Sequence, residues 1–377
     1  MKKFLDCISI VGATPSKFHG TKKYVSTGAV ATTEIDESEV VEVTYEDRPS
    51  RANLSAEAGD ILFAKMQGTR KTLLLDSETE ENIYSTGFYA VRANPEVITT
   101  ECLYYLIDSE LFLAQKDKNC SGATQKAITN GGMAKIEISV PALSEQGILV
   151  DKLKHLTQLI ADKKKQLNLF DEIIKSRFIE MFGDPVYNTL KLPTKPLSEL
   201  GSLDRGRSKH RPRNDPRLLG GPYPLIQTGE VSNAGLYITG YQNTYSELGL
   251  KQSKMWKAGT LCITIAANIA QTAILTFDAC FPDSVVGFIP TDEINIIYMH
   301  YWFSFFQKIL DEQAPQVAQK NINLKILSEL QVAIPSIEEQ SDFATFVEQV
   351  DKSKFEIQQS LEKLEILKKS LMQQYFG

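Results

Sequence analysis

The chain has 377 residues, of which 42% are hydrophobic and 23% charged, and its formal net charge is −6. These values are typical of a globular protein with two or three domains, and no apolar run reaches the roughly 18–20 residues that span a bilayer. The five cysteines lie far apart without a Cys-x-x-Cys pair, and no two of the four histidines are close together. This argues against a disulfide framework and a zinc or histidine-based metal centre, and it favours a reducing cytoplasm.

Residues 1–140 are predicted to form the first mixed α/β domain. Short β-branched and aromatic runs, such as ILF at 61–63, are separated by Gly, Asn and Pro turns, a pattern typical of strands. The segment carries 15 Lys and Arg against 20 Asp and Glu. Two polar-basic stretches nevertheless stand out, one in a glycine-containing turn at 65–71 and one at 116–126.

Residues 141–183 are predicted to form a long central helix, and residues 334–377 a second one. Proline precedes each helix and glycine follows it, as expected for helix start and stop signals. Apolar residues recur in alternating steps of three and four, which is the seam of a coiled coil. One such stripe alone fits packing on its own domain, but two in the same register favour packing of the helices on each other. The predicted seam residues are Leu149, Leu153, Leu156, Ile160, Leu167, Phe170, Ile174, Phe343, Val347, Val350, Ile357, Leu361, Leu364 and Leu371.

Residues 184–333 are predicted to form the second mixed α/β domain, with strands such as LCITI at 261–265. Residues 204–217 hold six Lys and Arg and two Asp, and arginine dominates over lysine. The guanidinium group forms the bidentate fork that suits phosphate or the guanine edge. The run fits a solvated flexible loop or a nucleic-acid contact.

The chain contains two copies of one plan. VPALSEQ at 140–146 recurs as IPSIEEQ at 334–340, and QKAIT at 125–129 matches QKNIN at 319–323 at the same offset of 194. Further upstream, GDILF at 59–63 matches GTLCI at 259–263 at an offset of 200. Because these matches keep their order along the chain, we infer a tandem duplication of a globular domain followed by a long helix. The fold class is therefore α+β, with two mixed α/β domains joined by two long helices in an antiparallel coiled coil, related by a pseudo-twofold axis.

This arrangement, with a Pro-x-x-x-Glu-Gln motif opening each long helix, resembles the specificity subunit of type I restriction–modification enzymes over the entire chain. The segment GDIL at 59–62 followed by Gly68 and Thr69 also resembles the target-recognition domains of that family. The second domain departs from it, because IAAN at 265–268 stands where the basic glycine turn would be.

The resemblance implies that each recognition domain reads one half of a split double-stranded DNA target. It also implies that the paired helices set the spacing and dock two methyltransferase subunits, with restriction motor-nuclease subunits completing the complex. S-adenosylmethionine, ATP and Mg are then expected on the partner subunits, in the cytoplasm, and no cofactor or metal on this chain. The candidate DNA contacts are Lys65, Gln67, Thr69, Arg70, Lys71, Lys116, Lys118, Thr124, Gln125, Lys126, Arg205, Arg207, Lys209, Arg211, Arg213, Arg217, Asn268, Gln316, Gln319, Lys320 and Asn321.

Catalytic motifs are absent from the sequence. It contains no Asn-Pro-Pro-aromatic or Asp-Pro-Pro-Tyr segment, no phosphate-binding P-loop and no carboxylate spacing that marks an acid–base pair. We therefore expect a binding subunit without catalysis of its own, and a fused restriction–methylation enzyme fails on the same ground. An alternative from another class remains open, a coiled-coil adaptor with two protein-binding domains and no role on DNA.

Overall fold

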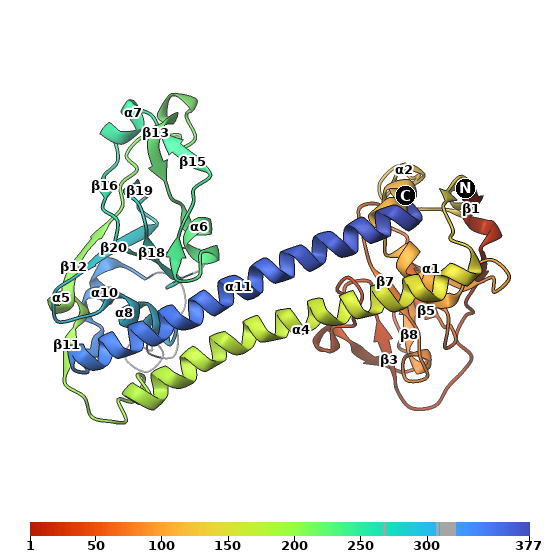
Figure 1. Ribbon diagram of the computed structural model, residues 1–377, viewed down its shortest axis with the longest axis horizontal. Coiled ribbons are helices and arrows are strands. Elements are labelled where there is room, and N and C mark those ends of the chain that lie inside the picture. The colour runs from red at the N-terminus through yellow and green to blue at the C-terminus, as the bar shows by residue number, and fades with distance from the viewer. Residues whose placement is uncertain (267–268, 307–308, 310–321) are drawn as a thin grey trace. The chain divides into compact units, whose positions relative to one another are not determined.

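The computed structural model describes residues 1–266, 269–306, 309 and 322–377. The chain divides into two compact units, one made of Met1–Lys165 with Gln358–Gly377 and the other of Gln166–Ile357. Each unit contains one globular part together with a portion of both long helices, α4 (Leu143–Phe182) and α11 (Ile337–Phe376) (Figure 1). The long helices are thus shared between the units and are not separate bodies.

The globular part of the first unit consists of short strands and helices in which two four-stranded sheets dominate. The sheets have the orders β2-β9-β6-β7 and β4-β3-β8-β5, and a third pair joins β1 to β10. The elements are β1 (Lys2–Lys3), β2 (Ile8–Val11), β3 (Lys22–Val25), β4 (Val41–Val43), β5 (Ala52–Leu54), β6 (Ile61–Ala64), β7 (Thr72–Leu74), β8 (Ile83–Ser85), β9 (Phe88–Ala93), α1 (Thr100–Ile107), α2 (Glu110–Lys118), α3 (Asn130–Met133) and β10 (Glu137–Ile138), with 3-10 turns at Phe4–Asp6, Glu37–Glu39 and Thr79–Glu81.

The second unit repeats this topology strand for strand. Its sheets have the orders β12-β20-β17-β18-β14 and β15-β13-β19-β16, with β11 paired to β21, and β14 is the one addition among the described strands. The elements are β11 (Thr194–Pro196), α5 (Leu197–Leu200), β12 (Gly201–Arg205), β13 (Leu219–Leu225), α6 (Thr228–Asn233), β14 (Tyr237–Ile238), β15 (Asn243–Tyr245), α7 (Glu247–Lys251), β16 (Met255–Trp256), β17 (Leu261–Thr264), β18 (Thr272–Leu275), β19 (Ala279–Cys280), β20 (Val285–Pro290), α8 (Ile296–Phe303), α10 (Leu324–Glu329) and β21 (Gln331–Ala333), with a 3-10 turn at Pro216–Leu218. The duplication inferred from the sequence is therefore a duplication of fold.

The central strand of each unit is buried on both faces. In β6, Ile61 and Phe63 belong to the core shared with the helices, whereas Leu62 and Ala64 face the core between the two sheets. Strand β17 alternates in the same way. Such a strand has no polar face, which explains why both runs are continuously apolar in the sequence.

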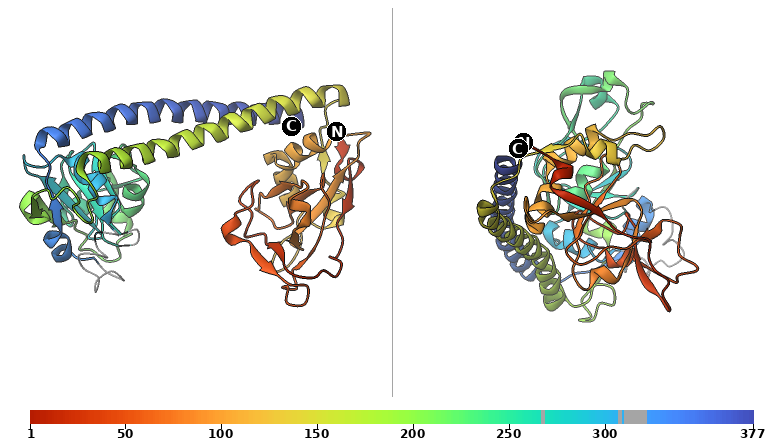
Figure 2. Two further views of the ribbon diagram at one scale, coloured as in Figure 1. Left: turned by 90° about the horizontal axis from the view of Figure 1, so that it is seen from below. Right: turned by 90° about the vertical axis from the view of Figure 1, so that its right-hand side faces the viewer.

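The long helices lie side by side and antiparallel within each unit (Figures 1 and 2). Lys164 contacts Glu365 in the first unit, and Lys354 contacts Asp171 in the second. Every predicted seam residue is buried or half-buried. The ends of the seam, however, join the cores of the globular parts, as Leu149 and Leu153 do in the first unit. Both packing modes considered from the sequence are therefore present, on the domain at the helix ends and between helices elsewhere.

The repeated Glu-Gln pair locks the start of each long helix to its own globular part. The Gln146 side chain is fully buried, accepts a hydrogen bond from the Thr99 amide at 2.8 Å and donates to the Val97 and Pro141 carbonyls, each at 3.0 Å. Gln340 does the same with the Asn295 amide and the Glu293 and Pro335 carbonyls. The preceding glutamates, Glu145 and Glu339, accept hydrogen bonds from the backbone amides of Ala142 and Ser336, the residues just before each helix. The motif that reveals the duplication is thus a structural joint.

We expect the Gln146→Leu variant to lower the free energy of unfolding of the first unit by about 2–4 kcal/mol. Leucine has similar volume but leaves the Thr99 amide and the Val97 and Pro141 carbonyls without this partner. A fully buried group of this kind costs about 1–3 kcal/mol, and these half-buried groups cost less because water still reaches part of them. Urea unfolding followed by circular dichroism measures the loss. Gln158→Leu, at an exposed position of the same helix, is the matched control. Equal stability of the two variants would contradict the role of the joint.

Candidate nucleic-acid interface

The structure brings the two polar-basic stretches of the first unit together. The loop that follows β6 and the segment 121–127 are joined by a bridge between Met66 and Ala127. The Gln67 amide donates to the Lys126 carbonyl at 3.0 Å, and the Ile128 amide donates to the Lys65 carbonyl at 2.9 Å. These two loops, residues 65–71 and 121–127, form one surface that we call the first reading surface. On it Gln67, Thr124, Gln125 and Lys126 are exposed, Lys118 at the end of α2 is exposed nearby, and Thr69 is half-buried.

Three predicted cations of this region are held by protein groups. Arg70 makes a bidentate ion pair with Asp108 at 2.9 and 3.0 Å, and this hydrogen-bonded pairing raises the arginine pKa. Lys71 donates to the Thr27 carbonyl. Lys65 donates to the Thr86 carbonyl at 2.9 Å, and burial lowers its pKa. These side chains shape the surface, and only a part of each faces outward.

Lys116 requires a correction. The sequence prediction groups it with exposed cations, but its side chain is only 2% exposed. The helix pattern contains the signal, because Phe112 lies one turn earlier on the same face of α2 and is also buried. A buried ammonium group that is satisfied by protein acceptors does not meet a phosphate.

A pocket of about 510 Å³ opens beside the first reading surface. Its lining includes Lys65 and Lys71 together with Arg51, Thr86 and Gln125. Arg51 and Thr86 are not among the DNA contacts predicted from the sequence. Arg51 ends a short Arg-Pro-Ser-Arg run at 48–51, and a second arginine within four residues is the signal that could have marked it.

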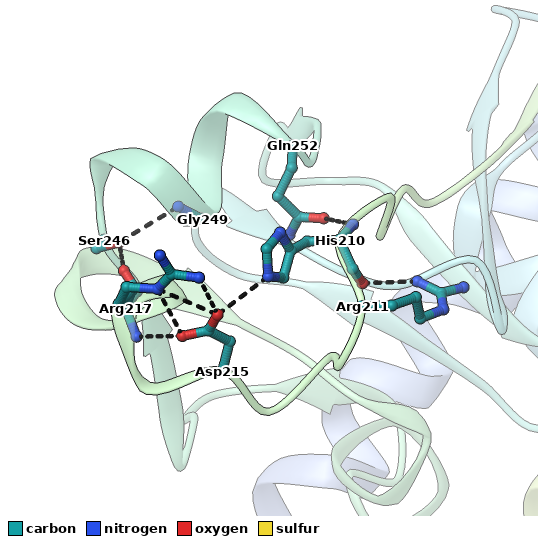
Figure 3. A network of polar contacts seen from close by, with 7 residues as sticks. All are labelled: His210, Arg211, Asp215, Arg217, Ser246, Gly249 and Gln252. Atoms are coloured by element: carbon teal, nitrogen blue, oxygen red, sulfur yellow. Dashed lines mark hydrogen bonds and ion pairs between the residues drawn. The ribbon is translucent and has the colours of Figure 1, made fainter.

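In the second unit the basic loop 204–217 is folded against acidic residues. Arg205 donates to the Asp283 carbonyl at 3.0 and 2.7 Å, and the Asp283 carboxylate pairs with Arg213 at 2.5 Å and with Arg211 at 3.9 Å. Arg217 makes a bidentate pair with Asp215, which also contacts His210 at 3.0 Å (Figure 3). The hydrogen bonds from Arg217 hold the pKa of the Asp215 carboxyl well below its usual range.

Two cationic side chains of the basic loop, Arg207 and Lys209, remain available to contact a ligand. Within the described part of the chain, the exposed side chains of Arg207 and Lys209 make no hydrogen bond or ion pair. Arg205, Arg211, Arg213 and Arg217 are exposed despite their contacts. The loop is therefore held by its contacts with Asp215 and Asp283 while it presents cations to solvent. The other predicted contacts of this unit, Asn268, Gln316, Gln319, Lys320 and Asn321, lie outside the described residues.

The candidate surfaces of the two units occupy the same edge of equivalent sheets. In the first unit β6 ends at Ala64, opposite Phe88 at the start of β9, and the loop 65–71 leaves from there. In the second unit β17 ends at Thr264, opposite Val285 at the start of β20. The basic loop leaves β12 at Arg205, which pairs with the neighbouring Val286. The two units thus present cations at one equivalent edge, but from different loops.

The described residues contain no group of three or more His, Cys, Asp or Glu that could hold a metal ion. Among these residues, no helix is both long and apolar enough to cross a membrane.

The sequence profile of the type I restriction modification DNA specificity domain matches residues 10–169 and 192–368. The chain belongs to this family. The two matched segments coincide with the two halves of the duplication, so each half is one specificity domain.

Relatives of this family agree with the assignment. The specificity subunit of the type I restriction enzyme EcoBI from Escherichia coli is 25% identical over 268 residues, which cover 63% of this chain. That alignment covers 56% of the relative, so the chain spans about half the length of that curated protein.

Solved structures show the same fold. A chain from a structure of the assembly and conformational transition of the type I R-M system has a TM-score of 0.60 and 20% identity, covering 98% of this chain and 97% of that chain. The type I restriction–modification S subunit from M. genitalium has a TM-score of 0.51 and 13% identity, with coverages of 99% and 94%. The predicted fold, two mixed domains with two long helices, is confirmed.

Proposed function

We propose that the chain is the DNA-recognition subunit of a type I restriction–modification complex and reads a bipartite target, one half with each specificity domain. The observation that carries this proposal is the placement of exposed cations at the same edge of two equivalent sheets. A repeated fold with equivalent reading edges can read two half-sites, and cations there supply the phosphate attraction that DNA binding needs.

The side chains of the two edges suit base readout as well as phosphate binding. Gln67 and Gln125 in the first unit carry amides that can pair with the adenine edge, and Arg207 in the second carries the fork that suits guanine. Because the exposed residues differ between the units, we propose that the two half-sites differ in sequence. The first unit has an excess of acidic residues, so partner subunits are expected to supply further phosphate contacts.

We propose that the paired helices dock two methyltransferase subunits. In the first unit they form a groove of about 480 Å³ lined by Ile148, Leu156, Leu367 and Leu371. Ile148 is 62% exposed, and in the second unit Phe355 is 63% exposed. Exposed large apolar side chains gathered on one element mark contact sites for other proteins. Methyl transfer with S-adenosylmethionine, and ATP- and Mg-dependent restriction, would then belong to the methyltransferase and restriction subunits of a cytoplasmic complex.

Retention of DNA by the chain together with purified methyltransferase subunits tests the proposal. We expect specific binding. The logarithm of its binding constant should fall linearly with the logarithm of salt concentration, with a slope of about −0.9 per neutralised phosphate. The chain alone is expected to bind weakly and to transfer no methyl group. A complex with no affinity for DNA at low salt would instead favour the adaptor with two protein-binding domains.

A further inference from the structure

Lys116, in the last turn of α2, binds the loop 65–71 of the first reading surface from its buried side. The buried Lys116 ammonium donates to the Met66 carbonyl at 2.7 Å and to the Thr69 carbonyl at 3.1 Å, and the Ala64 carbonyl lies at 3.5 Å. The bonded carbonyls flank Gly68, the turn residue of the loop, whose φ of +72° lies in the left-handed region. One side chain thus ties together both sides of the turn.

Asp117 completes this contact from the next position. One of its carboxylate oxygens accepts a hydrogen bond from the Gly68 amide at 3.0 Å, and the other lies 3.1 Å from the Lys116 ammonium. Its backbone carbonyl accepts a bond from the Gln67 amide side chain at 3.3 Å. The turn therefore has its carbonyls bonded to a cation and its amide bonded to an anion.

Lys116 and Asp117 together hold this turn, and we call the pair the α2 clamp. The energetics indicate that the clamp does more than fill space in the core. Burying an ammonium group costs several kcal/mol, and an apolar side chain of the same size would fill the space without that cost. An apolar side chain would leave the Thr69 carbonyl without its partner and the Met66 carbonyl with only the 3.3 Å bond from the Thr69 amide, so the turn between them would be less constrained. Because the turn is bonded to the segment 121–127, any rearrangement would also move Gln125 and Lys126.

We propose that Lys116 and Asp117 are positioning residues for base readout by the first specificity domain, which they control without touching DNA. The inference rests on the proposed function. It separates two properties of the first reading surface: its exposed residues supply the contacts, and the α2 clamp fixes the geometry in which those contacts match base edges. Readout requires positions accurate to a fraction of an ångström, whereas attraction to phosphate does not.

The test uses the complex of the full chain with its methyltransferase subunits, a DNA pool randomised in both half-sites, and sequencing of the bound fraction. For Lys116→Met we expect base preference in the half-site of the first domain to fall at least about tenfold, with preference in the other half-site unchanged. Because Lys116 is buried, the salt slope of nonspecific binding should stay as in the unaltered chain. Lys135→Met, which removes an exposed lysine elsewhere in the same unit, is the matched control.

A second variant keeps the test decisive if Lys116→Met does not fold. Asp117→Asn preserves size and an acceptor for the Gly68 amide but removes the charge beside Lys116, and a smaller loss of preference in the same half-site is expected. Folded variants with unaltered base preference would overturn the inference. So would a salt slope reduced by about one, which marks a direct phosphate contact. If the unaltered complex selects no sequence at all, the proposed function itself fails, and this outcome is distinct from the other two.

Discussion

Lengthening both helices by one heptad should lengthen the unread spacer of the DNA target by one to three base pairs and leave both half-sites unchanged. Seven residues add about 10 Å to a helix and keep the apolar seam in phase. Ten ångströms correspond to about three base pairs at ~3.4 Å each. The insertion points are after Gln166 in α4 and after Ser360 in α11, each within three residues of the point where the helix passes from one compact unit to the other. Methylation mapping of this variant measures the spacer.

A chain with the heptad in α4 alone is the control. Because the helices pack antiparallel in both units, as the Lys164–Glu365 and Lys354–Asp171 contacts show, extending one of them breaks the pairing. We expect this chain to lose stability and to direct no methylation. If the doubly extended chain keeps its spacer and changes its half-site bases, the helices do not set the spacing.

Replacing Arg205, Arg207, Arg211 and Arg213 with alanine should strongly weaken DNA binding by the assembled complex. Each lost phosphate contact lowers the salt slope by about 0.9, so the slope should fall by up to about 3–4. The Asp283 carboxylate would also lose its pairs with Arg211 and Arg213 and would then repel the DNA backbone. Titration of specific DNA over a range of salt concentrations measures both effects.

Matched loss of charge elsewhere in the second unit controls for net charge. Lys191, Lys195, Lys257 and Lys325 lie in that unit outside the basic loop, and their replacement should change the salt slope little. Replacing a single arginine that reaches a base should lower the discrimination between bases at one position of the DNA site by about 1–3 kcal/mol. An unchanged affinity and slope in the quadruple arginine variant would move the DNA surface to another part of the domain.

The architecture was predictable because the two copies of the domain keep the same sequence motifs for the same structural reasons. The Glu-Gln pairs that open the two helices recur since each buried glutamine satisfies three backbone groups, which no apolar side chain can do. The central strands are recognisable because burial on both faces demands a continuous apolar run. The division of the chain into two compact units was harder to predict from the sequence. The helices contribute to both globular cores, and helical periodicity does not tell which core a given turn joins.

The reading surfaces were predictable only as stretches of chain. Lys65 and Gln125 are far apart in sequence, and they line one pocket because the Met66–Ala127 bridge joins their loops. Likewise Arg205, Arg211 and Arg213 of the basic loop converge on Asp283, seventy positions beyond Arg213. Charge composition reveals cations but not their partners, which explains why Arg70 and Lys116 looked exposed in the sequence and are held by protein groups in the fold.

Mapping methylated adenines across the genome of a host with and without this chain, in the presence of the methyltransferase subunits, tests the account most directly. We expect methylation at a new split motif, two short defined sequences with a fixed spacer, only when the chain is present. In a host that carries Lys116→Met, one half of that motif should become degenerate while the other half stays defined. A methylation pattern that does not depend on the chain would contradict the assignment of DNA recognition to it.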